Sequence, residues 1–173
     1  MATTTTSPLV GLRRQATTES LLQTAVATRP DAVVALARIV LGAILIPHGL
    51  QHLTGAWGGP GLEGTTAFFT GVLQLPAVSI PFVIGTELIG GALLILGILG
   101  RAMAAAAALM IAGAAVTVHL PHGFFMNWFG NQGGEGFEYH LLFLALTAVV
   151  VRHGSGAWSV DSVLTSRREP TQQ

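Results

Sequence analysis

The sequence predicts an all-α, polytopic membrane protein: a four-transmembrane-helix bundle with both termini in the cytoplasm. Of its 173 residues, 51% are hydrophobic and only 9% are charged. A soluble domain carries about 25% charged residues, so this chain has too few polar groups to cover a surface that faces water. Four apolar stretches and the placement of the arginines then predict the number of helices and their orientation.

The composition also excludes several classes of function. The chain contains no cysteine, which excludes thiol catalysis, disulfides and iron–sulfur ligation by its own side chains. Its eight basic residues are balanced by eight acidic ones, so nothing in the charge favours nucleic-acid binding. A redox role would therefore require a bound cofactor or a partner protein.

The order of apolar and polar segments predicts three regions. Residues 1–30 are rich in Thr, Ser and Arg and lack the apolar core of a secretory signal, which predicts a flexible cytoplasmic tail. Residues 31–153 form the transmembrane domain, and residues 154–173 form a cytoplasmic C-terminal tail. We expect the side chains of His153 and Asp161 to be solvated. The apolar stretches within the domain are 31–53, 78–99, 102–120 and 137–151.

The length that a helix needs to cross the membrane agrees with the first three of these stretches. A hydrocarbon core of about 30 Å requires about 20 helical residues. The first three stretches are long enough, whereas the fourth is short and implies local thinning of the bilayer or an extended interfacial turn. Small residues are frequent between positions 85 and 115, and such residues let helix backbones approach closely in lipid.

The arginines predict the orientation in the cell inner (cytoplasmic) membrane. Seven of the eight precede the first stretch, separate the second from the third, or follow the fourth. The loops 54–77 and 121–136 contain no arginine, so the positive-inside rule places both on the outer side. Both loops carry aromatic residues of the kind that anchor at the membrane surface, and we expect loop 54–77 to lie there as a partial lid.

Ionisable residues within these apolar stretches predict a functional site. Counting a helical rise of about 1.5 Å per residue from the cytoplasmic arginines places His48, Glu87, His119 and Glu138, one from each stretch, at one level in the outer leaflet. Carboxylates are costly at this depth unless they face a partner, so we expect a shared His/Glu cluster. The candidate ligand-binding residues are Arg38, His48, Gln51, His52, Glu87, His119, His122 and Glu138.

Two of these positions have an additional rationale. His52 shares one helical face with His48 and Gln51, because the three residues are spaced at i, i+3 and i+4. Arg38 lies deeper, inside the first stretch, where it either extends toward the cytoplasmic surface or pairs from below with a carboxylate or an anionic ligand.

Short motifs along the chain add a resemblance to a known family. Taken in order over residues 32–164, they resemble the DoxX-like family of four-helix membrane proteins. The motifs are Leu36-Ala37-Arg38, His48-Gly49, Glu87-Leu88-Ile89-Gly90-Gly91, His119 with Gly123-Phe124-Phe125, and Phe137-Glu138-Tyr139. The resemblance implies a four-helix membrane bundle.

Some relatives are subunits of thiosulfate:quinone oxidoreductase, and others are linked to oxidative, thiol or quinone stress. Relatives often carry Lys after the His-Gly pair, where this chain has His52.

We therefore expect a membrane subunit of a redox or respiratory-linked system that binds a quinone-like ligand at the outer-leaflet cluster. The sequence leaves open whether this subunit is itself catalytic. One alternative is a metal-binding or haem-binding bundle, with His48, Glu87, His119 and Glu138 as candidate metal ligands. A second alternative is a non-enzymatic membrane anchor or assembly partner of a soluble oxidoreductase. Homo-oligomerisation is compatible with each.

Overall fold

A computed structural model of the chain describes residue 24 and residues 26–166. These residues form helices, turns and loops without a β-strand, so the all-α fold class is confirmed. The expected tail 1–30 lies mostly outside the described residues. The elements, with η for a 3₁₀ or π-helical turn, are α2 (Ala32–Thr54), η1 (Ala56–Gly58), α3 (Gly61–Ala67), η2 (Phe68–Val72), α4 (Ser79–Gly85), η3 (Thr86–Gly90), α5 (Gly91–Leu96), α6 (Gly100–Ala114), η4 (Ala115–His119), η5 (Leu120–His122), α7 (Glu138–His153) and α8 (Val160–Ser166).

Three helical segments are long and apolar enough to cross a membrane. The first is α2, with 23 residues; the second runs through α4, η3 and α5 over Ser79–Leu96; the third runs from α6 to η5 over Gly100–His122. They match the first three predicted stretches to within a few residues. The expected fourth helix forms as α7, but its 16 residues are short for a span, so the count of four spans stays a prediction.

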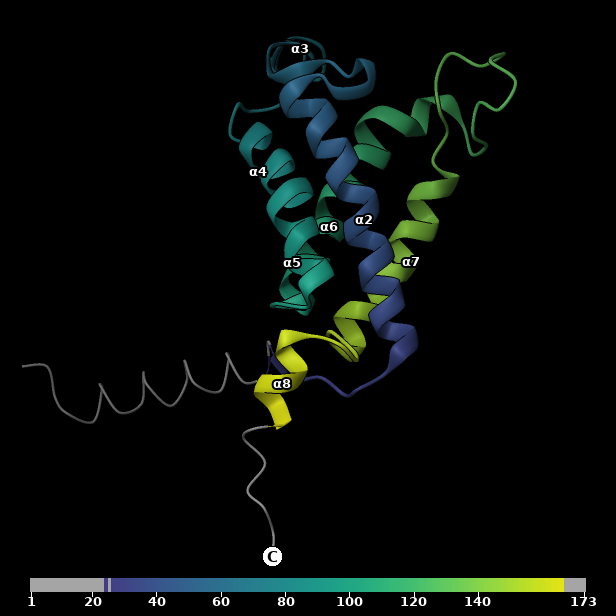
Figure 1. Cartoon of the computed structure of the whole chain (residues 1–173). Helices are drawn as coiled ribbons and strands as arrows, with labels where there is room; N and C mark the ends of the chain where they lie inside the picture. The colour runs from purple at the N-terminus through teal and green to yellow at the C-terminus, as the bar shows by residue number, and fades with distance from the viewer. Residues whose placement is uncertain (1–23, 25, 167–173) are drawn as a thin grey trace, which may run out of the picture.

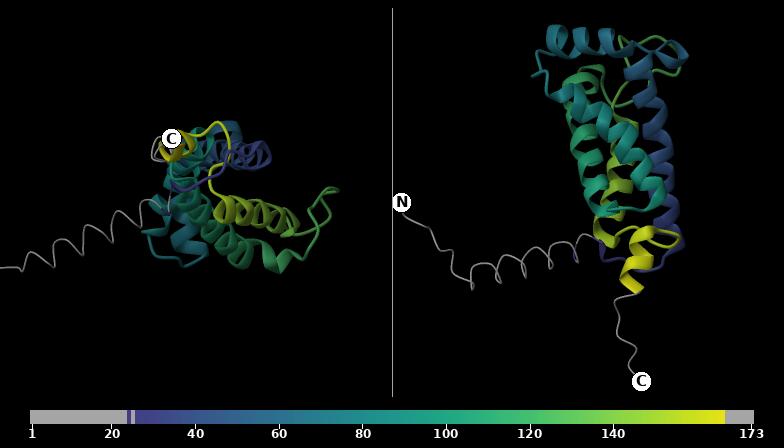
Figure 2. Two further views of the ribbon diagram at one scale, coloured as in Figure 1. Left: turned by 90° about the horizontal axis from the view of Figure 1, so that it is seen from below. Right: turned by 60° about the vertical axis from the view of Figure 1, so that its left-hand side comes forward.

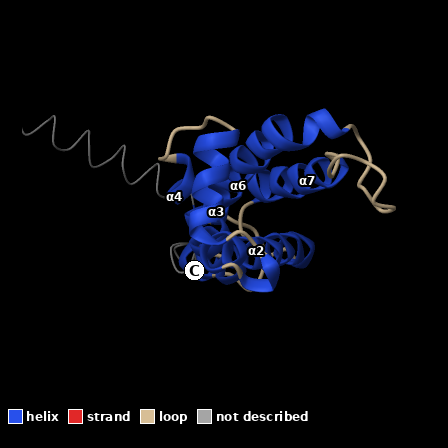
Figure 3. Cartoon of the chain, turned by 90° about the horizontal axis from the view of Figure 1, so that it is seen from above, coloured by secondary structure: helices blue, strands red, loops and turns tan. Residues whose placement is uncertain are grey.

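The four helical rods lie side by side (Figures 1 and 2). The helix α2 packs against α5 and α7, and α6 packs against α7. The buried core between them is built from Leu41 and Leu45 of α2, Leu94 of α5, Ala107 of α6 and Phe143 of α7, together with smaller residues. Figure 3 shows the rods end-on. This arrangement is the bundle that the apolar stretches predicted.

Capping groups in the sequence fix the two ends of α2. At its start, Asp31 accepts hydrogen bonds from the backbone N–H groups of Val33 and Val34 at 2.8 and 3.0 Å, as an N-cap side chain does. At its end, Gly55 adopts a left-handed conformation with φ of 78°, which glycine accepts without steric cost. The two caps therefore set where α2 begins and where it ends.

The two ends of the bundle differ in structure. At the end that we call the α3 end, α3 and η2 form within the predicted lid segment 54–77 and lie over α2 and α4 (Figure 1). The neighbouring segment 123–137 contains no helix. At the opposite α8 end, Arg101 donates to the carbonyl groups of Ala27, Val151 and Arg152. Three arginine-bearing parts of the chain thus meet at the α8 end. This agrees with the prediction that these arginines lie on one side of the membrane.

The segment after α7 corrects one expectation from the sequence. Asp161 was expected to be solvated, but this is wrong: its side chain is 2% exposed. Its carboxylate accepts hydrogen bonds from the backbone N–H groups of Leu99 and Gly100, both at 3.1 Å, and from the hydroxyl of Ser155 at 2.6 Å. The first N–H groups of a helix have no partner within it, so Asp161 supplies the cap that α6 needs. His153 is exposed, as expected.

Arg38 is held inside the bundle by backbone carbonyl groups. Its side chain has 0% exposure, so it does not extend to the surface. It donates to the carbonyl oxygens of Leu94 and Ile95 in α5, and of Ser155, Ala157 and Trp158 after α7. A guanidinium has five N–H donors, and these five bonds use all of them. Arg38 therefore ties α2 to α5 and to the C-terminal segment.

We expect Arg38→Met to lower the free energy of unfolding by about 3 kcal/mol or more, because it leaves several buried carbonyl groups without their donors. Unfolding in detergent micelles, followed by circular dichroism, measures the loss. Arg152→Met is the matched control, since Arg152 lies at the same end of the bundle and is exposed. Equal stability of the two variants would contradict the proposed role of Arg38.

We expect Asp161→Ala to destabilise the start of α6 by about 1–2 kcal/mol, as the loss of other helix caps does. The local readout is amide hydrogen exchange, which should become faster at Leu99 and Gly100 than in the unaltered protein. Glu63→Ala serves as the control because Glu63 is exposed on α3. Unchanged protection of those two amides would show that the cap is unimportant.

Candidate functional site

The clearest polar site within the membrane-spanning helices is a carboxylate paired with an imidazole. Glu87 lies in η3 and is 4% exposed. Its Oε2 atom lies 2.8 Å from Nδ1 of His52, near the end of α2. The His52 side chain is 29% exposed, so the pair has one buried member and one member that reaches the α3 end. An ionisable pair in this position can pass a proton between the surface and the helix interior.

A glycine allows this pair to form. A Cβ atom added at Gly49 would lie 2.7 Å from the Leu88 side chain and 2.9 Å from Cβ of Glu87, closer than such atoms approach in proteins. Only glycine therefore lets α2 and η3 come this near. The π-helical turn η3 interrupts the regular helix at this contact, and such turns are frequent at functional sites.

The lid segment covers the histidine of this pair. The ring of Phe69 in η2 lies 6.3 Å from the ring of His52. The hydroxyl of Thr65 in α3 donates to the backbone carbonyl of His52 at 3.0 Å, and Thr65 is 2% exposed. The lid is therefore attached to the end of α2 at the candidate site.

A second polar site joins two histidines. The rings of His119 in η4 and His140 in α7 lie 4.0 Å apart. Nδ1 of His119 lies 2.9 Å from the backbone carbonyl oxygen of Glu135, which can only accept, so Nδ1 of His119 carries the proton. Nδ1 of His140 is fully shielded from the surface and has no hydrogen-bond partner in the described part of the chain.

Two carboxylates brace the irregular segment beside these histidines. Glu138 accepts from the backbone N–H of Met126 at 3.0 Å, and Glu135 accepts from that of Asn127 at 2.7 Å. The ring of His122 packs beneath Gly134, where an added Cβ would overlap it. These residues therefore shape the loop between η5 and α7.

The structure distributes the predicted site residues over separate places. It joins His52 to Glu87, but His119 meets His140 instead of Glu138. No hydrogen bond or ion pair links the two sites within residues 26–166. Arg38 lies near the α8 end, and Gln51 packs against Gly59.

His48 turns away from this site. Its side chain is exposed, although the i, i+4 spacing placed it on the same face as His52. Gly49 is the residue of α2 that faces η3, and neighbouring helical residues diverge by about 100°. The register of α2 on η3, which Gly49 sets, therefore directs His48 outward.

His140 was not among the residues predicted from the sequence. It lies two positions after Glu138, which places the two side chains on different faces of a helix, and the glutamate was taken as the inward-facing one. His140 contacts His119 from a separate helix, and no spacing within one helix marks such a contact. Only the packing of α7 on α6 identifies it.

The candidate metal ligands do not assemble into one centre. Among the residues that the structure describes, no group of three or more His, Asp or Glu side chains is placed to hold a metal ion. His48, Glu87, His119 and Glu138 have the separate surroundings given above. The geometry therefore gives no support to the metal-binding alternative.

Comparison with known proteins identifies a family. The family model described as DoxX matches residues 33–120, which is about half of the chain. The match runs from α2 to η5 and includes Arg38, Glu87 and His119. No curated protein and no solved structure matches the chain.

We expect His140→Phe to raise the free energy of unfolding by about 1 kcal/mol, because the substitution removes a buried nitrogen that has no partner and keeps a ring against His119. Thermal unfolding in detergent measures the change. His153→Phe is the control, since His153 is an exposed histidine of the same helix. A clear loss of stability in His140→Phe would show instead that the imidazole itself holds the two helices together.

Proposed function

Because the chain belongs to the DoxX family, we propose that this membrane protein binds a quinone-like ligand and exchanges protons with it through Glu87 and His52. The observation that carries the proposal is the 2.8 Å contact between these two side chains. An ionisable residue inside a membrane helix is costly and is by default a functional candidate. Glu87 meets that description, and His52 connects it to the α3 end.

The chemistry of a quinone fits such a pair. Reduction of a quinone to a quinol takes up two electrons and two protons, and each proton adds to one carbonyl oxygen. Histidine and carboxylate side chains are the usual groups that deliver protons near neutral pH. The chain has no cysteine, so the electrons would come from a bound cofactor or from a partner oxidoreductase, of which we favour the partner. We therefore place this protein as the membrane subunit of a redox-linked system.

The arginines orient the protein in this proposal. The α8 end, where Arg101 contacts the carbonyl groups of Val151 and Arg152, faces the cytoplasm according to the positive-inside rule. The His52–Glu87 pair then opens toward the outer side of the inner membrane. Protons for a ligand at this pair would be exchanged with that side.

A second candidate function is a membrane anchor or assembly partner for a soluble oxidoreductase. It is favoured by the internal use of several charged groups. Arg38 donates only to carbonyl groups of its own chain, and Glu138 and Asp161 accept from its own backbone. In this case the His52–Glu87 pair would hold α2 against η3 and bind no ligand.

We expect Glu87→Gln and His52→Ala each to weaken the binding of a short-chain quinone to the purified protein by about tenfold, equivalent to about 1.4 kcal/mol. The measurement is the quinone-dependent rise in melting temperature, titrated in detergent micelles. Glu87→Gln keeps the size of the side chain and removes the exchangeable carboxyl proton, so it separates proton chemistry from packing.

The controls are Glu63→Gln, an exposed carboxylate on α3, and His153→Ala, an exposed histidine at the opposite end. Both should bind quinone as the unaltered protein does. If Glu87→Gln and His52→Ala lower the stability but bind quinone normally, the anchor function is favoured. If quinone does not raise the melting temperature of the unaltered protein or of any variant, the proposed ligand is wrong.

A further inference from the structure

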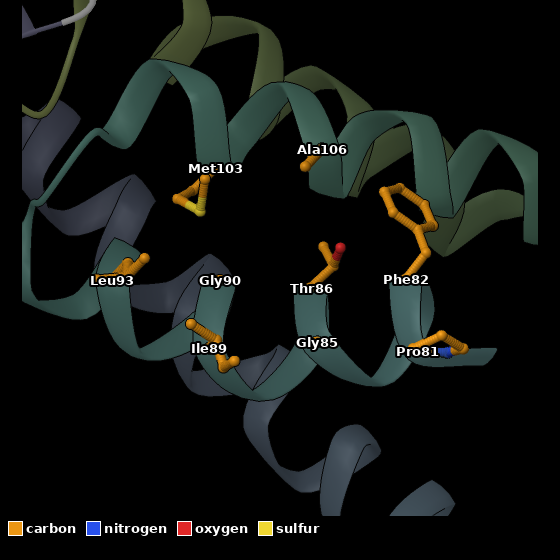
Figure 4. Close-up of a pocket in the computed structure, with 9 residues that line it drawn as sticks. All are labelled: Pro81, Phe82, Gly85, Thr86, Ile89, Gly90, Leu93, Met103 and Ala106. Carbon is orange, nitrogen blue, oxygen red and sulfur yellow. The ribbon is translucent and has the colours of Figure 1, made fainter. Parts of the chain in front are cut away.

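A groove of about 340 Å³ lies between the α4–η3–α5 segment and α6. Figure 4 shows the lining residues that both walls of the groove contribute. Its lining is almost entirely apolar and includes Phe82, Gly85, Gly90, Leu93, Met103 and Ala106. Because both walls belong to helices apolar enough to span the membrane, the groove is open to the hydrocarbon of the bilayer.

One polar side chain points into this groove. Thr86 is 8% exposed, and Figure 4 shows its side chain between the two helices, directed toward α6. Its hydroxyl makes no hydrogen bond within the described residues. Most threonines of the other helices bond back to a carbonyl one turn earlier, as Thr117 does to Gly113 and Thr147 to Leu144, both at 2.8 Å, and Thr65 donates to the carbonyl of His52. Thr86 opens the π-helical turn η3 and departs from this behaviour.

An unpaired hydroxyl in hydrocarbon is unfavourable. Leaving such a group without a partner has a free-energy cost in proteins, and the lipid around the groove offers no acceptor at this depth. A ligand that brings an acceptor to Thr86 would remove the cost. The hydroxyl therefore marks where the polar group of a ligand would lie.

The depth of Thr86 selects the class of ligand. Thr86 lies seven residues below Ser79, which begins the segment, so it is about 10 Å inside the span. The hydrocarbon core is about 30 Å thick, and the ester groups of phospholipids stay near its surface. A ketone or quinone carbonyl on a hydrocarbon chain is apolar enough to reach this level.

We infer that the groove binds a membrane-dissolved carbonyl compound with a long isoprenoid or alkyl chain, and that the hydroxyl of Thr86 donates to its carbonyl oxygen. The volume lies in the range of small-molecule sites. A transmembrane helix suits the groove less well, because its backbone carbonyl groups are already hydrogen-bonded within the helix. The inference rests on the proposed function only for naming a quinone as the carbonyl compound.

This site is distinct from the His52–Glu87 pair. Glu87 follows Thr86 in the sequence, but it faces α2 and His52, whereas Thr86 faces α6. The backbone of η3 separates the two side chains. Ligand in the groove would therefore depend on Gly85 and Thr86, and proton exchange on Glu87 and His52.

The chain offers a matched pair of glycines for the test. A Cβ atom added at Gly85 or at Gly113 meets nothing within 4 Å, so both positions accept a larger side chain without an internal clash. Only Gly85 lines the groove. Gly85→Leu would fill the groove, and Gly113→Leu adds the same side chain elsewhere on a membrane helix.

The experiment compares two quinones, one without a chain and one with a ten-carbon chain, and a chain-matched hydrocarbon without a carbonyl group. Binding to the full chain in nanodiscs is measured by native mass spectrometry. We expect the long-chain quinone to bind at least tenfold more weakly to Gly85→Leu than to Gly113→Leu. Thr86→Val should lose a threefold to tenfold preference for the long-chain quinone over the hydrocarbon, and Thr86→Ser should keep it.

The outcomes separate this inference from the proposed function. Equal long-chain binding by Gly85→Leu and Gly113→Leu, or the absence of a carbonyl preference in the unaltered protein, overturns the inference whatever the result for Glu87→Gln. A change from dimer to monomer in Gly85→Leu, with lipid content unchanged, shows that a second copy occupies the groove and also overturns it. If the Gly85 and Thr86 variants lose binding as expected but Glu87→Gln has no effect, only the proton-exchange function is overturned.

Discussion

The guanidinium of Arg38 joins α2, α5 and the segment after α7, and the packing of the α8 end depends on it. Its five carbonyl partners come from parts of the chain 56 to 120 residues away. Gly97 makes room for it, since an added Cβ there would lie 3.0 Å from Cζ of Arg38. Asp161 then caps α6 beside the same cluster. All the hydrogen bonds of a charged group inside an apolar helix are thus made to backbone carbonyl groups.

The two ends of the bundle satisfy their polar groups in different ways. At the α8 end, one arginine and one aspartate bond only to the chain itself, mostly to its backbone. At the α3 end, a carboxylate meets an imidazole that is partly open to the surface, and His140 keeps an unpaired nitrogen. Buried groups without full internal satisfaction are more costly than satisfied ones. Polar side chains that are not fully paired within the chain are therefore concentrated near the α3 end, where we have proposed that a ligand binds.

The sequence predicted the helices because the cost of exposing polar backbone in lipid leaves few alternatives. Apolar composition alone was sufficient to locate α2, the α4–α5 segment, α6 and α7 to within a few residues. It could not identify the partners of Arg38, since backbone carbonyl groups carry no side-chain pattern. Asp161 was expected to be solvated as part of the C-terminal tail, whereas it is buried because it pairs with the otherwise unpaired N–H groups at the start of α6. Likewise, Glu87 and His52 were both candidates, but the contact between them depends on the register that Gly49 imposes.

Two adjacent polar residues of the π-helical turn η3 have different surroundings. The carboxylate of Glu87 faces His52 on the α2 side, and the hydroxyl of Thr86 faces the groove on the α6 side. A threonine hydroxyl in a helix can bond to the carbonyl one turn earlier, and those of Thr70 and Thr117 do so within the π-helical turns η2 and η4. A wider turn therefore does not by itself prevent this bond. The unpaired hydroxyl of Thr86 is better explained by a ligand that pairs with it than by the stability of the bundle.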